Sequence, residues 1–180
     1  MPDGLFSGLL VVDLTRVLAG PFCTMMLAEL GARVIKVENP NGGDDSRRFE
    51  PFFQGQSAYF ASLNRGKESI ALDLKGEADG AVFRKLVGRA DVLVENFRPG
   101  TMERLGLGYE SLRAVNRRLI YAAVSGFGQT GPCSRKPAYD LIVQALSGMM
   151  SVTGHPGGPP TKAGTSIGDI TGGLFLLAGI

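Results

Sequence analysis

The 180-residue sequence predicts an α/β fold: a Rossmann-like, doubly wound and mostly parallel sheet. The first observation is a series of short, nearly continuous apolar runs, such as residues 9–14 and 91–95, which are typical of strands buried on both faces. The second is that these runs alternate with helical patterns, as in parallel sheets that helices cover on both sides. Ligands of such folds bind outside the carboxyl ends of the strands, so the turns after the strands are the expected site.

The elements follow from the same patterns. After the strand at 9–14, Pro21 suits the first position of a helix, and Gly31 suits its end. Four more strands are expected, at 32–38, 69–74, 91–95 and 119–125. A helix is expected over 77–89, where apolar residues recur at four-residue spacings, and two short helical segments between Leu105 and Val115.

Two loops and one further helix complete the expected chain. The polar loop 39–56 contains Asp44 and Asp45, and solvated charge is favoured over a metal site because no further ligand has suitable spacing. The only histidine, His155, lies in a loop rich in glycine and proline, so hydrolases with a histidine base are disfavoured. Between these loops a helix is expected whose wide apolar stripe indicates core, with Leu141, Ala145 and Met149 beside Ile142, Leu146 and Met150.

Composition indicates one globular α/β domain over residues 1–180, with 44% hydrophobic and 20% charged residues. A net charge of +2 gives no bulk signal for nucleic acid or a membrane surface, and no apolar run is long enough for a membrane span. Cys23 and Cys133 make no disulfide or metal pattern, and residues 1–4 lack the features of a signal peptide, so a cytoplasmic protein with reduced thiols is expected. The chain ends in an apolar helix pattern at 174–180 without a stop signal, so we expect a piece of a longer protein.

Asp169 is the candidate catalytic residue. It lies among glycines at the start of an apolar run, where a ligand can approach the backbone closely and an aspartate could act as a nucleophile. The alternative is structural, because Ser166 and Asp169 fit the S/T-x-x-D/E capping box of a helix start. From these residues alone the cap is favoured.

One local charge imbalance indicates a polyanionic ligand. Between Arg84 and Arg118 there are eight Lys/Arg residues against four acidic ones. Arg98 and Arg104 flank a strand end and a Pro-Gly turn, where they could hold phosphate groups, whereas the other arginines toward the end of this stretch are expected on a solvated face.

Seven motifs, in order and with matching spacing, make the whole chain resemble the N-terminal part of class III CoA-transferases, the formyl-CoA transferase and carnitine CoA-transferase superfamily. They are LAGPF (18–22), GARVIKVE (31–38), NRGKESIALDLK (64–75), DVLVENFRPG (91–100), GFGQTGP (126–132), YDLIVQALSG (139–148) and GDITGG (168–173). The resemblance implies that Asp169 is the nucleophile, that coenzyme A is a substrate and not a permanently bound cofactor, and that the full-length protein forms an interlocked homodimer. It also implies coenzyme A contacts at Val17, Leu18, Leu72, Lys75, Asn96, Phe97, Arg98, Arg104, Lys136, Tyr139 and Asp140.

Departures from the family pattern bear on the substrate. Leu18, Asn39 and Asp140 replace a glutamine, an arginine and a glutamate found in some members, which disfavours a formyl-CoA/oxalate assignment and favours succinyl-CoA or another dicarboxyl-CoA as donor. The same superfamily includes α-methylacyl-CoA racemases, whose histidine would fall at Tyr139, so a transferase is favoured. A third alternative is a coenzyme A-binding fragment without turnover.

Overall fold

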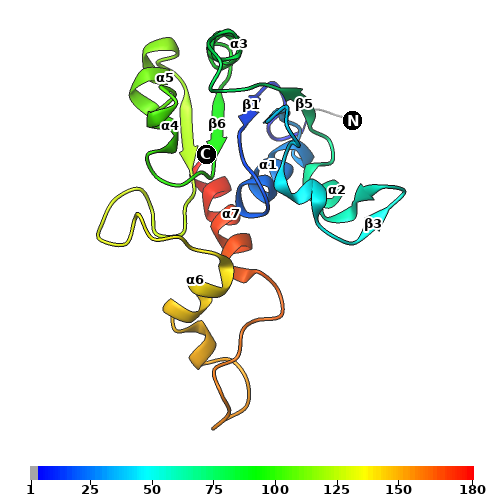
Figure 1. Ribbon diagram of the computed structural model, residues 1–180, viewed down its shortest axis with the longest axis vertical. Coiled ribbons are helices and arrows are strands. Elements are labelled where there is room, and N and C mark those ends of the chain that lie inside the picture. Colours follow the sequence, from blue (N-terminus) through cyan, green and yellow to red (C-terminus); the bar gives the residue numbers. More distant parts are fainter. Residues whose placement is uncertain (1–3) are drawn as a thin grey trace.

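The computed structural model describes residues 4–180; the first three residues, part of the N-terminal segment assessed above for a signal peptide, lie outside the described residues. The predicted α/β fold is confirmed by a five-stranded parallel sheet with helices on both faces (Figure 1). The sheet strands are β1 (Leu10–Asp13), β2 (Arg33–Glu38), β5 (Glu68–Ala71), β6 (Val92–Glu95) and β7 (Ile120–Ala123). A two-stranded antiparallel hairpin of β3 (Phe52–Phe53) and β4 (Gln56–Ser57) stands apart from them.

The sheet order is β5-β2-β1-β6-β7, so the chain builds outward from β1 in one direction and then from β6 in the other. The helices are α1 (Ala19–Glu29), α2 (Ala58–Asn64), α3 (Glu77–Val87), α4 (Thr101–Arg104), α5 (Tyr109–Val115), α6 (Asp140–Leu146) and α7 (Ile167–Gly179), with 3-10 turns η1 (Asp45–Arg48) and η2 (Met149–Ser151). No helix within residues 4–180 is long and apolar enough to cross a lipid bilayer.

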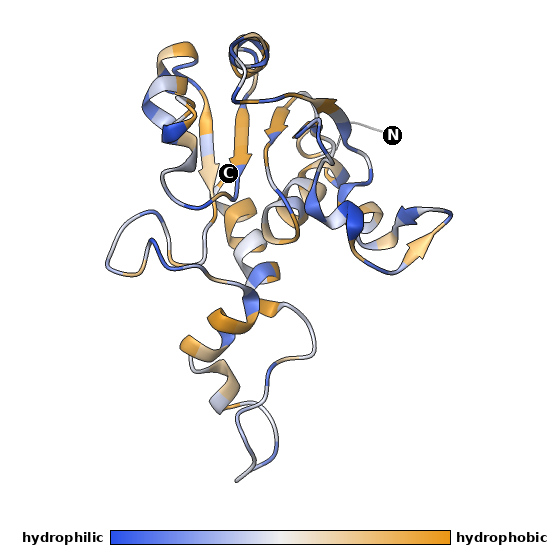
Figure 2. Ribbon diagram, in the orientation of Figure 1, coloured by the Kyte–Doolittle hydropathy of each residue, from blue (hydrophilic) through white to orange (hydrophobic). Residues whose placement is uncertain are grey.

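Both faces of the central strands β1 and β6 are buried, as the apolar runs predict. Val12 and Leu93 point into a core that includes Phe83 of α3 and Leu112 of α5. Their neighbours on β1 and β6 point into a second core with Leu27 of α1, which α7 also borders. Figure 2 shows β6 as a nearly unbroken hydrophobic strand. A strand that is covered on both sides buries consecutive side chains on opposite faces, so its sequence is a continuous apolar run and does not alternate between apolar and polar residues.

Several predicted boundaries are wrong. The third strand ends at Ala71, because residues 72–74 leave the sheet to line a cavity, and the fifth covers only Ile120–Ala123. Helix α1 begins two residues before Pro21, and α2, which begins at a Ser57 cap, was not expected. The predicted core stripe after residue 139 is also wrong, since α6 projects away from the sheet and Leu141, Ile142 and Leu146 are 50%, 44% and 66% exposed (Figures 1 and 2).

Candidate functional site

Two cavities lie at the carboxyl ends of β1 and β6, the neighbouring strands between which the direction of winding reverses. This switch point is where open α/β sheets bind ligands. The first cavity, of about 190 Å³, lies between the ends of β1, β2 and β6 and the segment after β5. The second, of about 370 Å³, lies between the ends of β6 and β7, the start of α1 and the start of α7. Arg16 and Phe97 line both, so the cavities adjoin.

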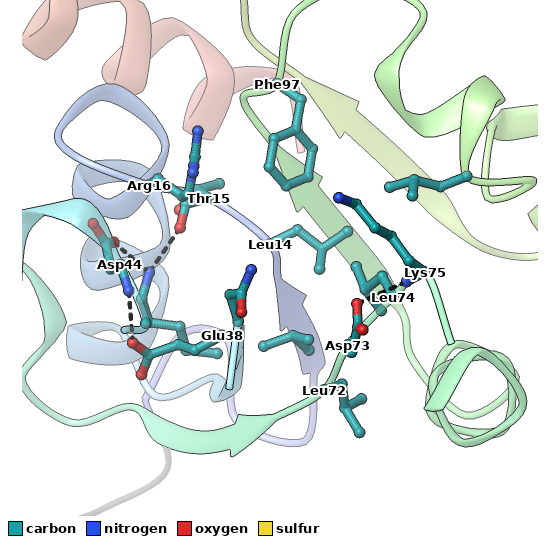
Figure 3. Close-up of a pocket in the computed structure, with 15 residues that line it drawn as sticks. Leu14, Thr15, Arg16, Glu38, Asp44, Leu72, Asp73, Leu74, Lys75 and Phe97 are labelled. Atoms are coloured by element: carbon teal, nitrogen blue, oxygen red, sulfur yellow. Dashed lines mark hydrogen bonds and ion pairs between the residues drawn. The ribbon is translucent and has the colours of Figure 1, made fainter. Parts of the chain in front are cut away.

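The first cavity has apolar walls and a charged rim (Figure 3). Its walls include Leu14, Leu72 and Phe97, and Lys75 stands at its edge. Glu38 closes the opposite side. Burial opposes the charge of this carboxylate, but hydrogen bonds from Arg47, Ser69 and the Asp44 amide outweigh that effect and lower the pKa of Glu38 to about 2.

Residues 15–17, here called the clamped turn, connect β1 to α1 and border both cavities. Side chains hold its backbone at each step. Thr15 N donates to Asp13 Oδ1 (2.8 Å) and Thr15 O accepts from Lys36 Nζ (2.7 Å). The Asn96 amide accepts from Arg16 N (2.8 Å) and donates to Arg16 O (2.7 Å), and Val17 N donates to Asp44 Oδ1 (3.2 Å).

The clamped turn holds Val17 at φ +68°, in the left-handed region that a β-branched residue rarely adopts. Such a conformation persists only where the surroundings impose it. The hydrogen bonds on either side of Val17 supply that constraint, so the shape of this cavity wall depends on Asn96 and Asp44.

Two buried ion pairs support the clamped turn from below. Lys36 Nζ lies 2.9 Å from Asp44 Oδ2 and Lys67 Nζ lies 3.0 Å from Asp13 Oδ2, and no side chain of the four is more than 2% exposed. Burial disfavours the charge of Asp13, but the two lysines and its hydrogen bonds outweigh that effect and lower its pKa. The prediction that Asp44 carries solvated loop charge is therefore wrong: the loop folds inward because the buried Lys36 needs a counter-charge.

Asp169 lines the second cavity from the first turn of α7. Helix α7 packs closely on the start of α1 at Gly173, where a Cβ atom would come within 2.5 Å of Ala19 O. Burial, and then the charge of Asp140, raise the pKa of Asp169, and within residues 4–180 no side chain forms a hydrogen bond or ion pair with its carboxylate. The charge of Asp169 also acts on Tyr59 of α2: burial, and then this charge, raise the pKa of the Tyr59 hydroxyl.

The predicted capping box at Asp169 is not formed. Ser166 has no side-chain bond to the helix start, and Gly168 N instead donates to Asp140 Oδ1 at 2.8 Å. The cap comes from the neighbouring helix α6, so Asp169 is left free for another role.

Most of the predicted coenzyme A contacts line one or both cavities, and two lie outside them. Leu72 and Lys75 line the first cavity, Phe97 lines both, and the second cavity contains Val17, Leu18, Asn96, Arg98, Lys136 and Tyr139. Arg104 lines neither and donates to Thr101 Oγ1 (2.9 Å), a residue of the second cavity. Asp140 lies behind the cavity as the α7 cap. Both the oxygen and the nitrogen of the Asn96 amide are hydrogen-bonded to the clamped turn, so this side chain shapes the site. That any of these residues contacts a ligand stays a prediction.

Arg16 is the main cavity residue that the sequence reasoning missed. Its guanidinium lies 3.2 Å from Asp45 and 5.7 Å from the centre of the Phe97 ring, between the two cavities. Its position directly after the first strand was an available signal, because that is where ligands bind in this fold. For Tyr59 the sequence offers no comparable signal, since it lies in the helix that was not expected.

The reactive group that the site offers is a carboxylate, not a metal centre formed by the described residues. Within residues 4–180 no group of three or more His, Cys, Asp or Glu side chains is placed to hold a metal ion. What the second cavity offers is the unpaired carboxylate of Asp169 near the start of α1, where the positive end of the helix dipole favours developing negative charge. Exposed cations at Arg98 and Lys136 complete the lining.

A model of CoA-transferase family III matches residues 6–180. The chain belongs to this family. This CoA-transferase family III chain is 59% identical over 180 residues to an acetyl-CoA:oxalate CoA-transferase of Acetobacter aceti, with 99% of this chain and 46% of that protein covered. It is 50% identical to a succinate–glutarate CoA-transferase of Agrobacterium fabrum, with 97% of this chain and 45% of that protein covered.

Solved structures agree with the family assignment. A CAIB/BAIF family protein from Brucella suis superposes with a TM-score of 0.94 at 43% identity, with 98% of this chain and 48% of that chain covered. The family III chain therefore spans about half the length of the relatives it matches.

Proposed function

We propose that the full-length protein transfers coenzyme A from an acyl-CoA to a carboxylic acid, with Asp169 as nucleophile. The observation that carries the proposal is the placement of this carboxylate, partly buried and unpaired within residues 4–180, on a cavity at the switch point of the sheet. Its ordinary pKa of ~3.9 is raised by burial and by Asp140, which makes the anion a better nucleophile than a solvated aspartate.

The proposed reaction proceeds in balanced steps. A carboxylate oxygen of Asp169 attacks the thioester carbonyl and expels coenzyme A thiolate, leaving a mixed anhydride. The thiolate attacks the aspartyl carbonyl, which releases the donor acid and forms an aspartyl-CoA thioester. The acceptor carboxylate attacks this thioester and expels coenzyme A thiolate, leaving a second mixed anhydride. The thiolate then attacks the acceptor's acyl carbon, which forms the new acyl-CoA and releases the Asp169 carboxylate. Each tetrahedral intermediate carries an oxyanion that backbone N–H donors can stabilise.

For the substrate, we propose that the first cavity takes the nucleotide end of coenzyme A against Leu72 and Phe97, near Lys75, while the thioester enters the second cavity. Arg98 and Arg104 would then meet phosphate groups. The acids in the names of relatives, oxalate, glutarate and mesaconate, are all dicarboxylates, which supports a dicarboxylic acid as one substrate. One of these relatives is named for oxalate with acetyl-CoA, so oxalate stays among the candidate acids.

Two further features belong to this proposal. Exposed apolar residues on α6 and α7, including Leu146 (66%) and Phe175 (80%), are consistent with an interlocked homodimer in a cytoplasmic protein. A racemase finds no support, because Tyr139 is 77% exposed and no histidine of the described chain lines the second cavity. In this proposal coenzyme A is a substrate, and the reaction needs no permanently bound cofactor.

The test is made on the full-length protein. Asp169→Asn and Asp169→Ala should each lose at least ~10³-fold in kcat, the scale expected when a nucleophile is deleted. Glu110→Gln, which changes an 83% exposed carboxylate to an amide, serves as control and should keep full activity. Incubation with acyl-CoA followed by hydroxylamine should leave a mass tag on the peptide that contains Asp169. A tag elsewhere, or turnover by Asp169→Ala, would refute the proposal.

A further inference from the structure

Gln144 is the one buried side chain of α6, a helix whose apolar residues Leu141 and Leu146 are half or more exposed. At 1% exposure it is an unusual residue to find inside, because glutamine is mostly a surface residue and a buried amide must be hydrogen-bonded. The contact between α6 and the segment before α7 is therefore made through a polar group.

Every polar atom of the Gln144 amide has a partner. Oε1 accepts from Ala163 N (2.8 Å), and Nε2 donates to Asp140 Oδ2 (2.6 Å) and to Thr165 O (3.3 Å). This pattern requires one acceptor and two donors in a single planar group, which only an amide supplies at this length. The Gln144 amide thus connects α6 to the segment before α7, at Ala163 and Thr165, and also fixes the orientation of the Asp140 carboxylate.

Asp140 continues the chain of contacts. With Oδ2 held by Gln144, its other oxygen, Oδ1, accepts from Gly168 N at 2.8 Å, one residue before Asp169. Ser166 does not cap α7, so this bond is the side-chain cap that the described chain provides at the helix start. The direction in which Asp169 leaves the first turn of α7 depends on it.

We propose that Gln144 is a positioning residue for Asp169, acting through Asp140 and the backbone of residues 163–168. The inference rests on the proposed role of Asp169 as nucleophile. Gln144 touches neither cavity, so its effect falls on the alignment of the attacking carboxylate and not on the affinity for acyl-CoA. Misplacing a reacting group by about 1 Å can cost ~10²-fold in rate.

The experiment uses the full-length enzyme with Gln144→Met, which keeps length without polarity, and Gln144→Glu, which loses both donors. We expect kcat to fall about 10- to 10²-fold, with the KM for acyl-CoA within about 2-fold of wild type. Hydrogen–deuterium exchange of residues 161–170 in the resting enzyme should become faster. Gln129→Met, an exposed glutamine in a loop, is the matched control and should change neither quantity.

A rescue separates positioning from general damage. In the double variant Asp140→Asn with Gln144→Glu, an amide at 140 donates to a carboxylate at 144 and can still accept from Gly168 N, so kcat should recover relative to Gln144→Glu alone. Unchanged kcat and exchange in Gln144→Met would overturn the inference, as would faster exchange over the whole chain or no recovery in the double variant. Activity of Asp169→Asn would instead overturn the proposed function, and the exchange result does not depend on that outcome.

Discussion

Replacing Val17 by glycine and by alanine tests whether the clamped turn stores backbone strain. Both changes remove the two γ-methyl groups of valine, and the variants differ further only by the Cβ methyl, so their losses of side-chain contacts are similar. They differ in what the backbone then costs at φ +68°. A residue with a Cβ atom loses about 1–2 kcal/mol in a left-handed conformation, a cost that glycine escapes. Glycine in turn loses about 0.5–1 kcal/mol relative to alanine through chain entropy.

Together, the cost of the left-handed conformation and the entropic cost of glycine predict which of the two variants is the more stable. At Val17 the glycine variant should be more stable than the alanine variant by up to about 1.5 kcal/mol, whereas at an ordinary negative φ alanine would be the more stable by about 0.5–1 kcal/mol. Thermal unfolding of the full-length variants, at equal protein concentration because of the expected dimer, gives the ranking. An alanine variant that melts at or above the glycine variant would refute the argument that Asp44 and Asn96 hold Val17 under strain.

Three other predictions follow from named contacts. Lys67→Met should lower the free energy of unfolding, measured with denaturant, by about 3–5 kcal/mol, because it leaves the buried Asp13 carboxylate without its ion-pair partner. Adding Asp13→Asn should recover part of that loss. Burial raises the pKa of Glu95 from its ordinary 4.5 to about 7, so between these pH values the folded chain keeps a proton that the unfolded chain has released. The stability of the fold should therefore decrease as the pH rises from about 4.5 to 7. In thermal melts at several pH values, Glu95→Gln should remove this part of the decrease. Arg98→Ala should weaken coenzyme A binding by about 1–3 kcal/mol in calorimetry, whereas Arg118→Ala should leave it unchanged, and equal effects would place the phosphates elsewhere.

The sheet was predictable because burial on both faces leaves a direct trace in the sequence. The run at 91–95 contains β6 almost to the residue, since every residue of Val92–Glu95 is buried. The helix Ala58–Asn64 left no such trace: it has seven residues, only two of them buried, so no apolar period can be recognised. An apolar periodicity arises where one face of a helix is buried, so a short helix on the surface shows little of this periodicity.

The site was predictable where it follows strand ends and unpredictable where it depends on distant partners. Arg98 was predicted from its place beside a strand end, and Val17 and Leu18 from the family resemblance; all three line the second cavity, where β1 and β6 flank the switch point. The burial of Asp44 depends on Lys36, a charge in the middle of an apolar strand. That lysine was a readable sign that some acid must come inside, but the sequence alone does not say which one.

The segments on either side of Asp169 are held by the same kind of contact. The clamped turn is fixed by Asn96 and Asp44, and the approach to α7 is fixed by Gln144 and Asp140, in each case through side-chain bonds to backbone atoms. Hydrogen bonds constrain direction, which apolar packing does not, so they suit the proposed role of Asp169, in which the angle of attack matters. Among the described residues, the exposed side chains of the second cavity, such as Lys136 and Tyr139, make no such bonds. Substituting them should therefore cost the fold little and leave the geometry around Asp169 the same.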